Sequence, residues 1–378
     1  MSDSSSRLEP SPERILIRGV NWLGDAVMTT PAIQRLRETY PEAHITLLTH
    51  EKLADIWRAH PDVNEVETFG AKEGVGAIAQ RLKAKEFDLG IALPNSPRTA
   101  FELWRAGIPR RVGYCAPWRN WMLTHAVPRA TSVTHMRKRT EAEIRRLIDA
   151  PETASDTPVA EGSHHIHHYL RLVEAIGASS VPAAPRIEIP DGDLDSFAEQ
   201  FIPNGDKKRL WLGLNPGAEY GPAKRWPADR FVAAAVELTR QTDCGWLVFG
   251  AKGDNETESI ANEIDRQTSA ETVVNLVGRT SLAQLCAGLK FCDALLTNDS
   301  GPMHVAAAIG TPVVVPFGST SIELTGPGLP GDSTHQLLTA EAPCAPCFLR
   351  ECPADFRCMN EISVERVAEA TNKLTRQG

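Results

Sequence analysis

The carboxylate of Asp25 is one candidate catalytic group, in the turn NWLGDAVM at Asn21–Met28. A short β-rich run, Arg14–Arg18, precedes this turn, and helical apolar spacing follows it from Asp25 to Tyr40, which is typical of a strand followed by a helix. A carboxylate at such a turn could act as a general base and take the proton from an attacking hydroxyl. Aspartate is also a preferred N-cap residue, so a purely structural role for Asp25 is an equal alternative at this point.

A second turn, TNDSGPMH at Thr297–His304, could bind a phosphate or pyrophosphate. It follows the strand-like run Asp293–Thr297 and opens a helix with a proline near its first position, where proline is favoured. Backbone N–H groups at a helix start, with the hydroxyl of Ser300 and the small Gly301, form a suitable cradle for an anion.

A lysine in a third loop could complete that anion site. The loop Asn215–Trp226 follows the strand-like run Arg209–Leu214 and is rich in glycine and proline. Opposite a diphosphate, the ammonium group of Lys224 would stabilise the leaving group as its negative charge develops. The alternative is an exposed basic residue near a turn, but the place of the loop at the end of a strand favours function.

Two groups of residues have spacings compatible with metal binding. Cys344, Cys347, Cys352 and Cys358 could ligate zinc or an iron–sulfur cluster, and reduced structural thiols or a redox-sensitive pair are the favoured alternatives. The histidine-rich run 164–168 offers pairs three and four residues apart, but no neighbouring carboxylate or cysteine completes a site there. We expect no metal in the active site, and the sequence leaves the four cysteines undecided.

Strand and helix patterns alternate over two halves of the chain. Strand-like runs such as His44–Leu48 and Phe87–Leu93 alternate with helical stretches, and the alternation restarts at Arg209. This pattern predicts βαβ units and parallel sheets, an α/β fold. The proline-rich stretch SSVPAAPRIEIPDG predicts a linker. The expected organisation is a disordered tail at 1–13, a first domain at 14–178, a linker at 179–192 and a second domain at 193–378.

The composition indicates a globular protein with an uneven charge distribution. A length of 378 residues suits two domains of about 150 to 190 residues each. The sequence contains neither a recognisable secretory signal nor an apolar run long enough to span a membrane, so we expect a cytoplasmic protein. The net charge is −8, yet the segment 98–146 holds eleven Lys or Arg against three Glu. This local excess predicts an anionic partner: phosphates, an acidic sugar or a membrane surface.

Five ordered blocks of the sequence resemble glycosyltransferase family 9, the bacterial lipopolysaccharide heptosyltransferases with the GT-B fold. The blocks are RGVNWLGDAVMTTPAI (Arg18–Ile33), LPNSPRTAFELWRAGIPRRVGY (Leu93–Tyr114), NPGAEYGPAKRWP (215–227), TNDSGPMHVAAAIGTP (297–312) and FGSTSIELTGP (Phe317–Pro327). The resemblance covers the chain from Arg14 onward and is more specific than any single motif. It implies two doubly wound, Rossmann-like parallel-sheet domains facing a central cleft, the first binding the acceptor and the second the nucleotide sugar.

The family implies inverting transfer of a heptosyl unit from ADP-L-glycero-β-D-manno-heptose to the lipopolysaccharide inner core. The Asn21-Trp22 pair resembles the members that act on the first heptose of the core. By its position in the matched motif, Asp25 would be the base. The expected donor contacts are Lys224, Asp299, Ser300, Gly301 and Thr320, with Asp254 or Glu256 on the ribose. The resemblance implies no cofactor, because protein groups rather than an obligatory Mg²⁺ would meet the phosphate charge.

The acceptor would be the inner core carried on lipid A, with acidic Kdo sugars and phosphates that suit the basic segment 98–146. The expected acceptor contacts are Asn21, Asn95, Ser96, Arg98 and Arg137. Pro97 departs from the family pattern, which has an aromatic or other large residue there. We expect contact with the inner leaflet of the inner membrane, no nucleic acid partner and a monomer.

Three alternatives remain open on the sequence. A family member could transfer heptose to another core position. A nucleotide-sugar epimerase or hydrolase could share the two-domain architecture, because fold alone does not fix function. A protein could also bind the nucleotide sugar without turnover.

Overall fold

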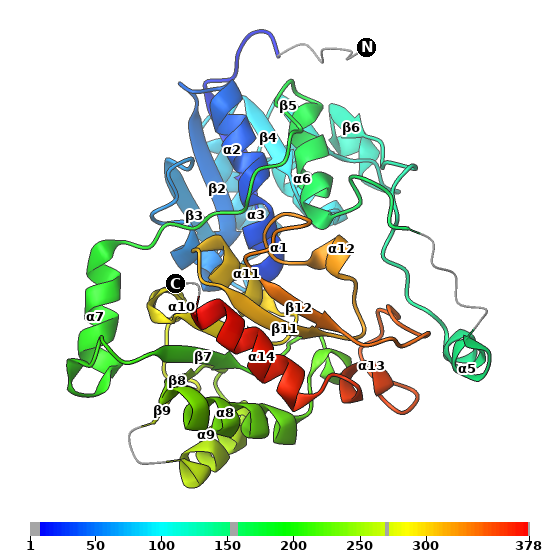
Figure 1. The fold of residues 1–378 in the computed structure, drawn as a ribbon. Helices are drawn as coiled ribbons and strands as arrows, with labels where there is room; N and C mark the ends of the chain where they lie inside the picture. The colour runs from blue at the N-terminus through cyan, green and yellow to red at the C-terminus, as the bar shows by residue number, and fades with distance from the viewer. Residues whose placement is uncertain (1–7, 152–157, 269–271, 377–378) are drawn as a thin grey trace. The chain divides into compact units, whose positions relative to one another are not determined.

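The computed structural model describes residues 8–151, 158–268 and 272–376, which form two α/β units (Figure 1). The first unit is built from residues up to 133 and from 161–188, and the second from 134–160 and from 189 onward. The expected first domain, 14–178, includes residues 134–160, which the structure groups with the second unit. Helix α5 (Glu141–Asp149) lies in this segment, and its Ile144 is buried in the apolar core of the second unit.

The first unit is built on a six-stranded parallel sheet in the order β3-β2-β1-β4-β5-β6. The strands are β1 (Arg14–Arg18), β2 (His44–His50), β3 (Glu65–Phe69), β4 (Leu89–Ala92), β5 (Arg110–Tyr114) and β6 (His125–Val127). Ile17 in β1 is paired with Leu47 in β2 and with Ile91 in β4, and all three side chains are buried. From β1 the chain first adds β2 and β3 on one side of the sheet, and it then adds β4, β5 and β6 on the other side. The switch point therefore lies between β1 and β4.

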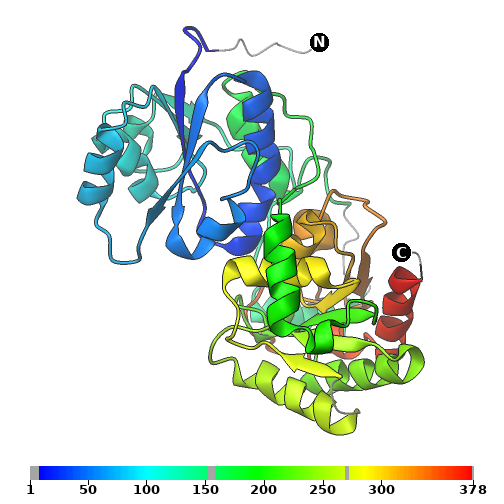
Figure 2. The ribbon, with the colours of Figure 1, turned by 90° about the vertical axis from the view of Figure 1, so that its left-hand side faces the viewer.

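Helices cover both faces of this sheet. They are α1 (Leu23–Met28), α2 (Thr30–Thr39), α3 (Val75–Lys83), α4 (Pro97–Arg105) and α6 (His165–Glu174), with the short 3₁₀ turns η1 (Glu51–Ile56) and η2 (Asn120–Met122). Helix α2 packs against α6, and α3 packs against α4. In Figure 2 these two pairs lie on opposite sides of the sheet, as in a doubly wound fold.

The second unit repeats this topology in the order β12-β11-β10-β7-β8-β9. Its strands are β7 (Trp211–Asn215), β8 (Gly245–Val248), β9 (Val273–Asn275), β10 (Ala294–Thr297), β11 (Val313–Phe317) and β12 (Gln336–Thr339). The switch point therefore lies between β7 and β10. The helical elements, in addition to α5, are α7 (Asp191–Phe201), α8 (Ala228–Thr242), α9 (Asn255–Gln267), α10 (Leu282–Phe291), α11 (Gly301–Ala308), α12 (Ile322–Thr325), α13 (Arg357–Asn360), α14 (Val364–Thr375), η4 (Pro203–Gly205) and η5 (Pro222–Lys224).

The helix expected over 25–40 is two helices, α1 and α2, separated at Thr29. Pro31 has no backbone N–H, so the hydrogen bond that would continue one helix to the carbonyl of Val27 cannot form. The hydroxyl of Thr30 donates to that carbonyl instead, at 2.9 Å. The proline therefore divides the helix where the spacing of apolar residues gave no sign of a break.

Parts of the expected tail and linker form hydrogen bonds with the first unit. Residues 1–7 of the tail lie outside the described residues. The backbone N–H of Glu13 donates to Asp88 at 2.9 Å, so the tail residues nearest β1 contact the first unit. In the linker, the backbone N–H of Arg186 donates to the hydroxyl of Thr30 at 3.1 Å and its guanidinium pairs with Asp62 at 2.9 Å. Within the described ranges, no helix has the length and apolar character needed to cross a bilayer.

Candidate active site

Asp25 lies in the turn after β1, at the switch point of the first sheet. Helix α1 begins at Leu23, and its N-cap residue, Trp22, makes no side-chain capping hydrogen bond. Asp25 is therefore inside the first turn of the helix and is not its N-cap, so the prediction that it could be the N-cap residue is wrong. Its side chain is 34% exposed, which leaves the carboxylate accessible to a substrate.

One histidine of α6, His165, lies beside that carboxylate. Nε2 of His165 is 3.9 Å from Oδ1 of Asp25, and the His165 ring is stacked on His168 with centroids 5.5 Å apart. The ring of His168 is stacked in turn on Tyr114 at 4.2 Å. Burial lowers the pKa of His165, and the negative charge of Asp25 acts in the opposite direction. Burial, and the Asp25 charge as a smaller cause, raises the pKa of Tyr169 well above its usual value.

These aromatic and imidazole groups are the part of the site that the sequence interpretation missed. The sequence suggests only a metal site for the run 164–168, whereas the structure places His165 beside the candidate base and stacks it on His168. The repeated spacing of three residues, which places both on one face of a helix, was the available signal.

Asn95 follows β4, on the other side of the same switch point. Its Nδ2 lies 3.4 Å from Nε2 of His168, and its buried Oδ1 has no hydrogen-bond partner among the described residues. The structure thus brings Asn95 to His168, which is stacked on the histidine beside Asp25. The neighbouring Ser96 caps α4 by accepting a hydrogen bond from the backbone N–H of Thr99 at 3.3 Å, so it already has a structural role.

Arg98, Arg137 and Asn21 are the other expected acceptor residues. Arg98 pairs with Glu102 at 2.9 Å and donates to the carbonyl of Glu73. Arg137 belongs to the second unit, where it pairs with Glu143. Asn21 is exposed in the turn before α1. None of these placements tests contact with an acceptor.

Three of the expected donor residues form one hydrogen-bonded cluster in the second unit. Lys224 follows β7, Asp299 follows β10 and Thr320 follows β11. Nζ of Lys224 and the hydroxyl of Thr320 both donate to Oδ2 of Asp299, each at 2.6 Å. Asp299 and Thr320 are buried, and the Lys224 side chain is 14% exposed. The cluster lies at the carboxyl ends of adjacent strands around the switch point, where open α/β sheets bind ligands.

Ser300 and Gly301 form the start of α11 next to this cluster. Ser300 is the N-cap residue and makes no capping hydrogen bond with its side chain. Its hydroxyl lies 3.5 Å from Nδ2 of Asn215 and 3.4 Å from the hydroxyl of Thr297. The first backbone N–H groups of an α-helix have no partners within the helix, and the dipole makes this end attractive to an anion.

A C-terminal segment, residues 347–350, supports the loops that carry Lys224 and Thr320. The hydroxyl of Tyr220 donates to the carbonyl of Phe348 at 2.8 Å. The backbone N–H of Ala223 donates to the carbonyl of Arg350 at 2.9 Å. The backbone N–H of Phe348 donates to the carbonyl of Ser319 at 2.7 Å. Residues distant in sequence therefore hold the two loops in place, and we call this segment the supporting loop.

Asp254 is the N-cap of α9. Its carboxylate accepts hydrogen bonds from the backbone N–H of Thr257 at 3.1 Å and from the Thr257 hydroxyl at 2.8 Å. The carboxylate also lies against Gly217 in the loop after β7, where an added Cβ would be 2.9 Å from Oδ2. Asp254 is therefore close to the donor-side loops, but its oxygens are already used to cap a helix.

The four cysteines of the sequence pattern are free thiols. Burial and the neighbouring thiols raise the pKa of Cys358 to about 12, and burial raises the pKa of Cys344 and of Cys347. In the described part of the chain, no three His, Cys, Asp or Glu side chains are arranged to hold a metal ion.

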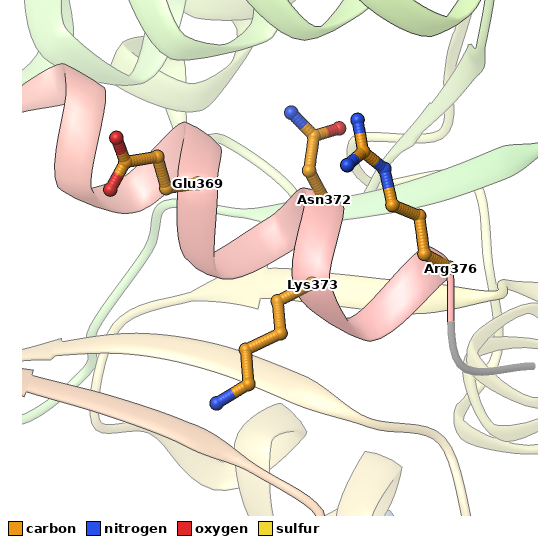
Figure 3. Close-up of a pocket in the computed structure, with 4 residues that line it drawn as sticks. All are labelled: Glu369, Asn372, Lys373 and Arg376. Carbon is orange, nitrogen blue, oxygen red and sulfur yellow. The ribbon is translucent and has the colours of Figure 1, made fainter.

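A surface hollow of about 410 Å³ lies on α14, and none of the candidate site residues lines it. Glu369, Asn372, Lys373 and Arg376 line it, all from one helix (Figure 3). Lys373 points away from Asn372 and Arg376 in this view. Side chains that diverge from one helix make a shallow surface feature, and we assign no function to it.

The two doubly wound sheets, with a candidate base at one switch point and a candidate anion site at the other, define a two-domain α/β protein of the GT-B class. The model of glycosyltransferase family 9 (heptosyltransferase) matches residues 75–356. The chain belongs to this family and is a glycosyltransferase.

Named relatives and a solved structure cover nearly the same length. The chain is 30% identical over 332 residues to lipopolysaccharide heptosyltransferase 2 of Escherichia coli (strain K12), covering 83% of this chain and 85% of the relative. It is 26% identical to lipooligosaccharide heptosyltransferase 2 of Campylobacter jejuni, covering 96% and 98%. The solved structure of E. coli ADP-heptose lps heptosyltransferase II is 25% identical, with a TM-score of 0.74 over 96% of this chain and 99% of that one. These comparisons confirm the family and the fold class inferred from the five sequence blocks.

Proposed function

We propose that this chain transfers a heptosyl unit from ADP-L-glycero-β-D-manno-heptose to the first heptose of the lipopolysaccharide inner core, with inversion at the anomeric carbon. The observation that carries the proposal is the cluster of Lys224, Asp299 and Thr320 beside the start of α11, in a chain whose named relatives are heptosyltransferases 2. A fixed cation next to a helix N-terminus suits a diphosphate leaving group.

In the proposed reaction Asp25 is the general base. The acceptor hydroxyl gives its proton to the carboxylate as its oxygen forms a bond to the anomeric carbon. The bond between that carbon and the diphosphate oxygen breaks on the opposite face, so one displacement gives inversion. Burial lowers the pKa of His165 and so favours its neutral form, which adds no positive charge beside the carboxylate.

ADP leaves with the negative charge that develops on its diphosphate. Lys224 supplies a positive charge, and Ser300 and the backbone of Gly301 supply hydrogen-bond donors. Asp299 and Thr320 hold the lysine in position. These groups need no divalent cation, so we expect turnover to be unchanged by a chelator such as EDTA; a loss that added Mg²⁺ restores would contradict this part of the proposal. Asp254 is proposed near the ribose.

On the acceptor side we propose contacts from Asn95, supported by its unpartnered buried Oδ1, and from Asn21, Ser96, Arg98 and Arg137. The excess of arginine in this part of the chain suits acidic Kdo sugars and lipid A phosphates. Since such an acceptor is anchored in the inner leaflet, we also propose that the protein works in the cytoplasm at the surface of the inner membrane. We propose that it does so as a monomer.

The decisive experiment is a transfer assay with ADP-heptose and two acceptors, Kdo₂-lipid A and its mono-heptosylated form. We expect product only from the mono-heptosylated acceptor, with an α linkage. Product from Kdo₂-lipid A instead, or only from an acceptor that carries two heptoses, would assign the chain to another core position. An incubation without acceptor is the matched control, because an epimerase or hydrolase would convert ADP-heptose there. Binding of ADP-heptose without conversion under any condition would indicate a binding protein.

A further inference from the structure

Exposed aromatic side chains gather on α4 and on the neighbouring turn η2. Phe101 and Trp104 lie on α4, Trp121 lies on η2, and Trp118 precedes it by three residues. The ring centroids of Phe101 and Trp104 are 5.5 Å apart, and those of Trp104 and Trp121 are 5.2 Å apart. Their exposed fractions are 36% for Phe101, 41% for Trp104, 86% for Trp118 and 62% for Trp121. We call these four residues the aromatic patch.

The patch is not scattered surface exposure. It contains four of the seven exposed large apolar side chains among the described residues, and contiguous exposed apolar surface marks an interaction site more often than single residues do. Beneath it, Ala100, Met122 and Leu123 form a small buried cluster that joins α4 to η2. The rings therefore project from a fixed base.

Trp118 adds evidence of a different kind. Its backbone has φ +67°, a left-handed conformation that is costly for a bulky residue. Such strain persists mainly where the surroundings impose it and function uses it. Here the residue in that conformation presents an indole ring that is 86% exposed, so packing within the chain leaves most of the ring uncovered.

The segment that carries the patch is rich in arginine, although Arg119 is buried and Arg110 pairs with Asp88. The segment 97–129 contains six arginines, no lysine and one acidic residue, Glu102, which gives a net charge of 6 − 1 = +5 within a chain of net charge −8. Glu102 is fully buried and paired with Arg18 and Arg98, so it offers no negative charge at the surface. Arg105, next to Trp104, is exposed.

We propose that the aromatic patch and the arginines of its segment dock on the surface of an anionic lipid bilayer. Tryptophan rings are favoured at the boundary between headgroups and acyl chains, and each exposed arginine gains attraction from anionic headgroups. A second copy of this chain fits less well, because a symmetric dimer would place the same arginine-rich surface against itself. The choice of a lipid surface as the partner rests on the proposed function, in which the acceptor is a membrane lipid. The existence of the patch and its positive charge does not depend on that function.

The test is co-sedimentation of the full chain with vesicles of phosphatidylglycerol and phosphatidylethanolamine, and with vesicles of phosphatidylcholine alone. We expect binding to the anionic vesicles only. The double variant Trp104→Ser/Trp121→Ser should bind at least about tenfold more weakly, and Arg105→Glu roughly fivefold more weakly. Val181→Ser and Arg58→Glu are matched controls, because Val181 is 63% exposed and the Arg58 side chain 72% exposed in the same unit but outside the patch. Both controls should bind as the unchanged chain does.

Transfer to a water-soluble, deacylated acceptor separates this proposal from the proposed function. The double variant should retain that activity while it loses binding to vesicles. If no chain transfers heptose but only the patch variants lose vesicle binding, the membrane surface stands and the proposed function fails. Equal vesicle binding by the double variant and the unchanged chain would overturn the proposal. So would a dimer in gel filtration that the double variant converts to a monomer, since the patch would then be a self-interface.

Discussion

Nζ of Lys224 donates to Oδ2 of Asp299 at 2.6 Å, and that carboxylate is 4% exposed. The hydroxyl of Thr320 donates to the same oxygen at 2.6 Å. The lysine is therefore held by a buried partner, and two of its three N–H donors remain for a ligand. A charge fixed in place before the ligand arrives loses less side-chain entropy on binding than a free lysine would.

Lys224→Ala should raise the Kd for ADP by roughly tenfold or more, because it removes the charge opposite the diphosphate. Isothermal titration with ADP measures the effect. Lys373→Ala is the control, because Lys373 is an exposed lysine of the same unit on α14. Equal affinity in Lys224→Ala and the control would place that lysine outside the donor site.

Asp299→Asn should also weaken ADP binding, although by less than Lys224→Ala. The amide keeps the shape but loses the charge that holds the ammonium group, so the lysine becomes mobile. We expect a change of roughly threefold to tenfold in Kd with no loss of folding. Tighter binding of ADP in this variant would instead show that Asp299 repels the diphosphate.

Asp25→Asn should lower turnover by a factor of roughly 10² or more and leave ADP affinity unchanged, because the amide cannot accept the acceptor proton. Steady-state transfer assays and ADP titrations measure the two quantities. Asp229→Asn is a matched control, since Asp229 is an exposed aspartate in the first turn of α8. Turnover that is unchanged in Asp25→Asn would remove this carboxylate from the mechanism.

Glu102→Gln should destabilise the first unit by about 3–5 kcal/mol, because it leaves the guanidinium of Arg18 buried without its counter-charge. Arg18 is 2% exposed and Glu102 fully buried, with 2.7 Å between Nε and Oε2. Arg98→Ala removes the half-exposed partner of the same carboxylate and should cost about 1 kcal/mol or less. Urea unfolding gives both values, and equal losses would mean that burial does not set the cost.

His60 predicts an acid-sensitive first unit. Burial lowers its pKa from 6.5 to about 4, against the opposing effect of Asp62. Below pH 6.5 the unfolded chain binds a proton there and the folded chain does not, so stability falls as the pH drops from 6.5 to about 4, by up to about 3 kcal/mol. In the unchanged chain the backbone N–H of Asp62 donates to Nδ1 of His60 at 3.3 Å, and His60→Asn keeps an acceptor for this N–H. Its unfolding free energy should change less over this range; identical slopes would contradict the assignment.

The sequence predicted both doubly wound sheets and the loops around the second switch point, because strand and helix periodicities are local signals. It could not predict that Lys224 and Asp299, 75 positions apart, share a hydrogen bond. It also left Asp25 undecided, because an N-cap and the third residue of a helix differ by three positions, within the usual error of helix boundaries predicted from sequence.

The first unit shows the same limit. His165 and His168 reach Asp25 and Asn95 only through the packing of α6 on the sheet, which no local pattern contains. Arg137 was expected with the acceptor residues of the first domain, but its segment packs with the second unit through the buried side chain of Ile144.

The supporting loop has a consequence for the order in which the protein is made. The hydrogen bonds of Tyr220 and Ala223 end on Phe348 and Arg350, more than a hundred residues later in the chain. During synthesis, the segment that carries Lys224 leaves the ribosome long before these partners exist, and β10 and β11 must follow it as well. A nascent chain therefore cannot complete the support of the cluster of Lys224, Asp299 and Thr320 until residues 347–350 have also been translated.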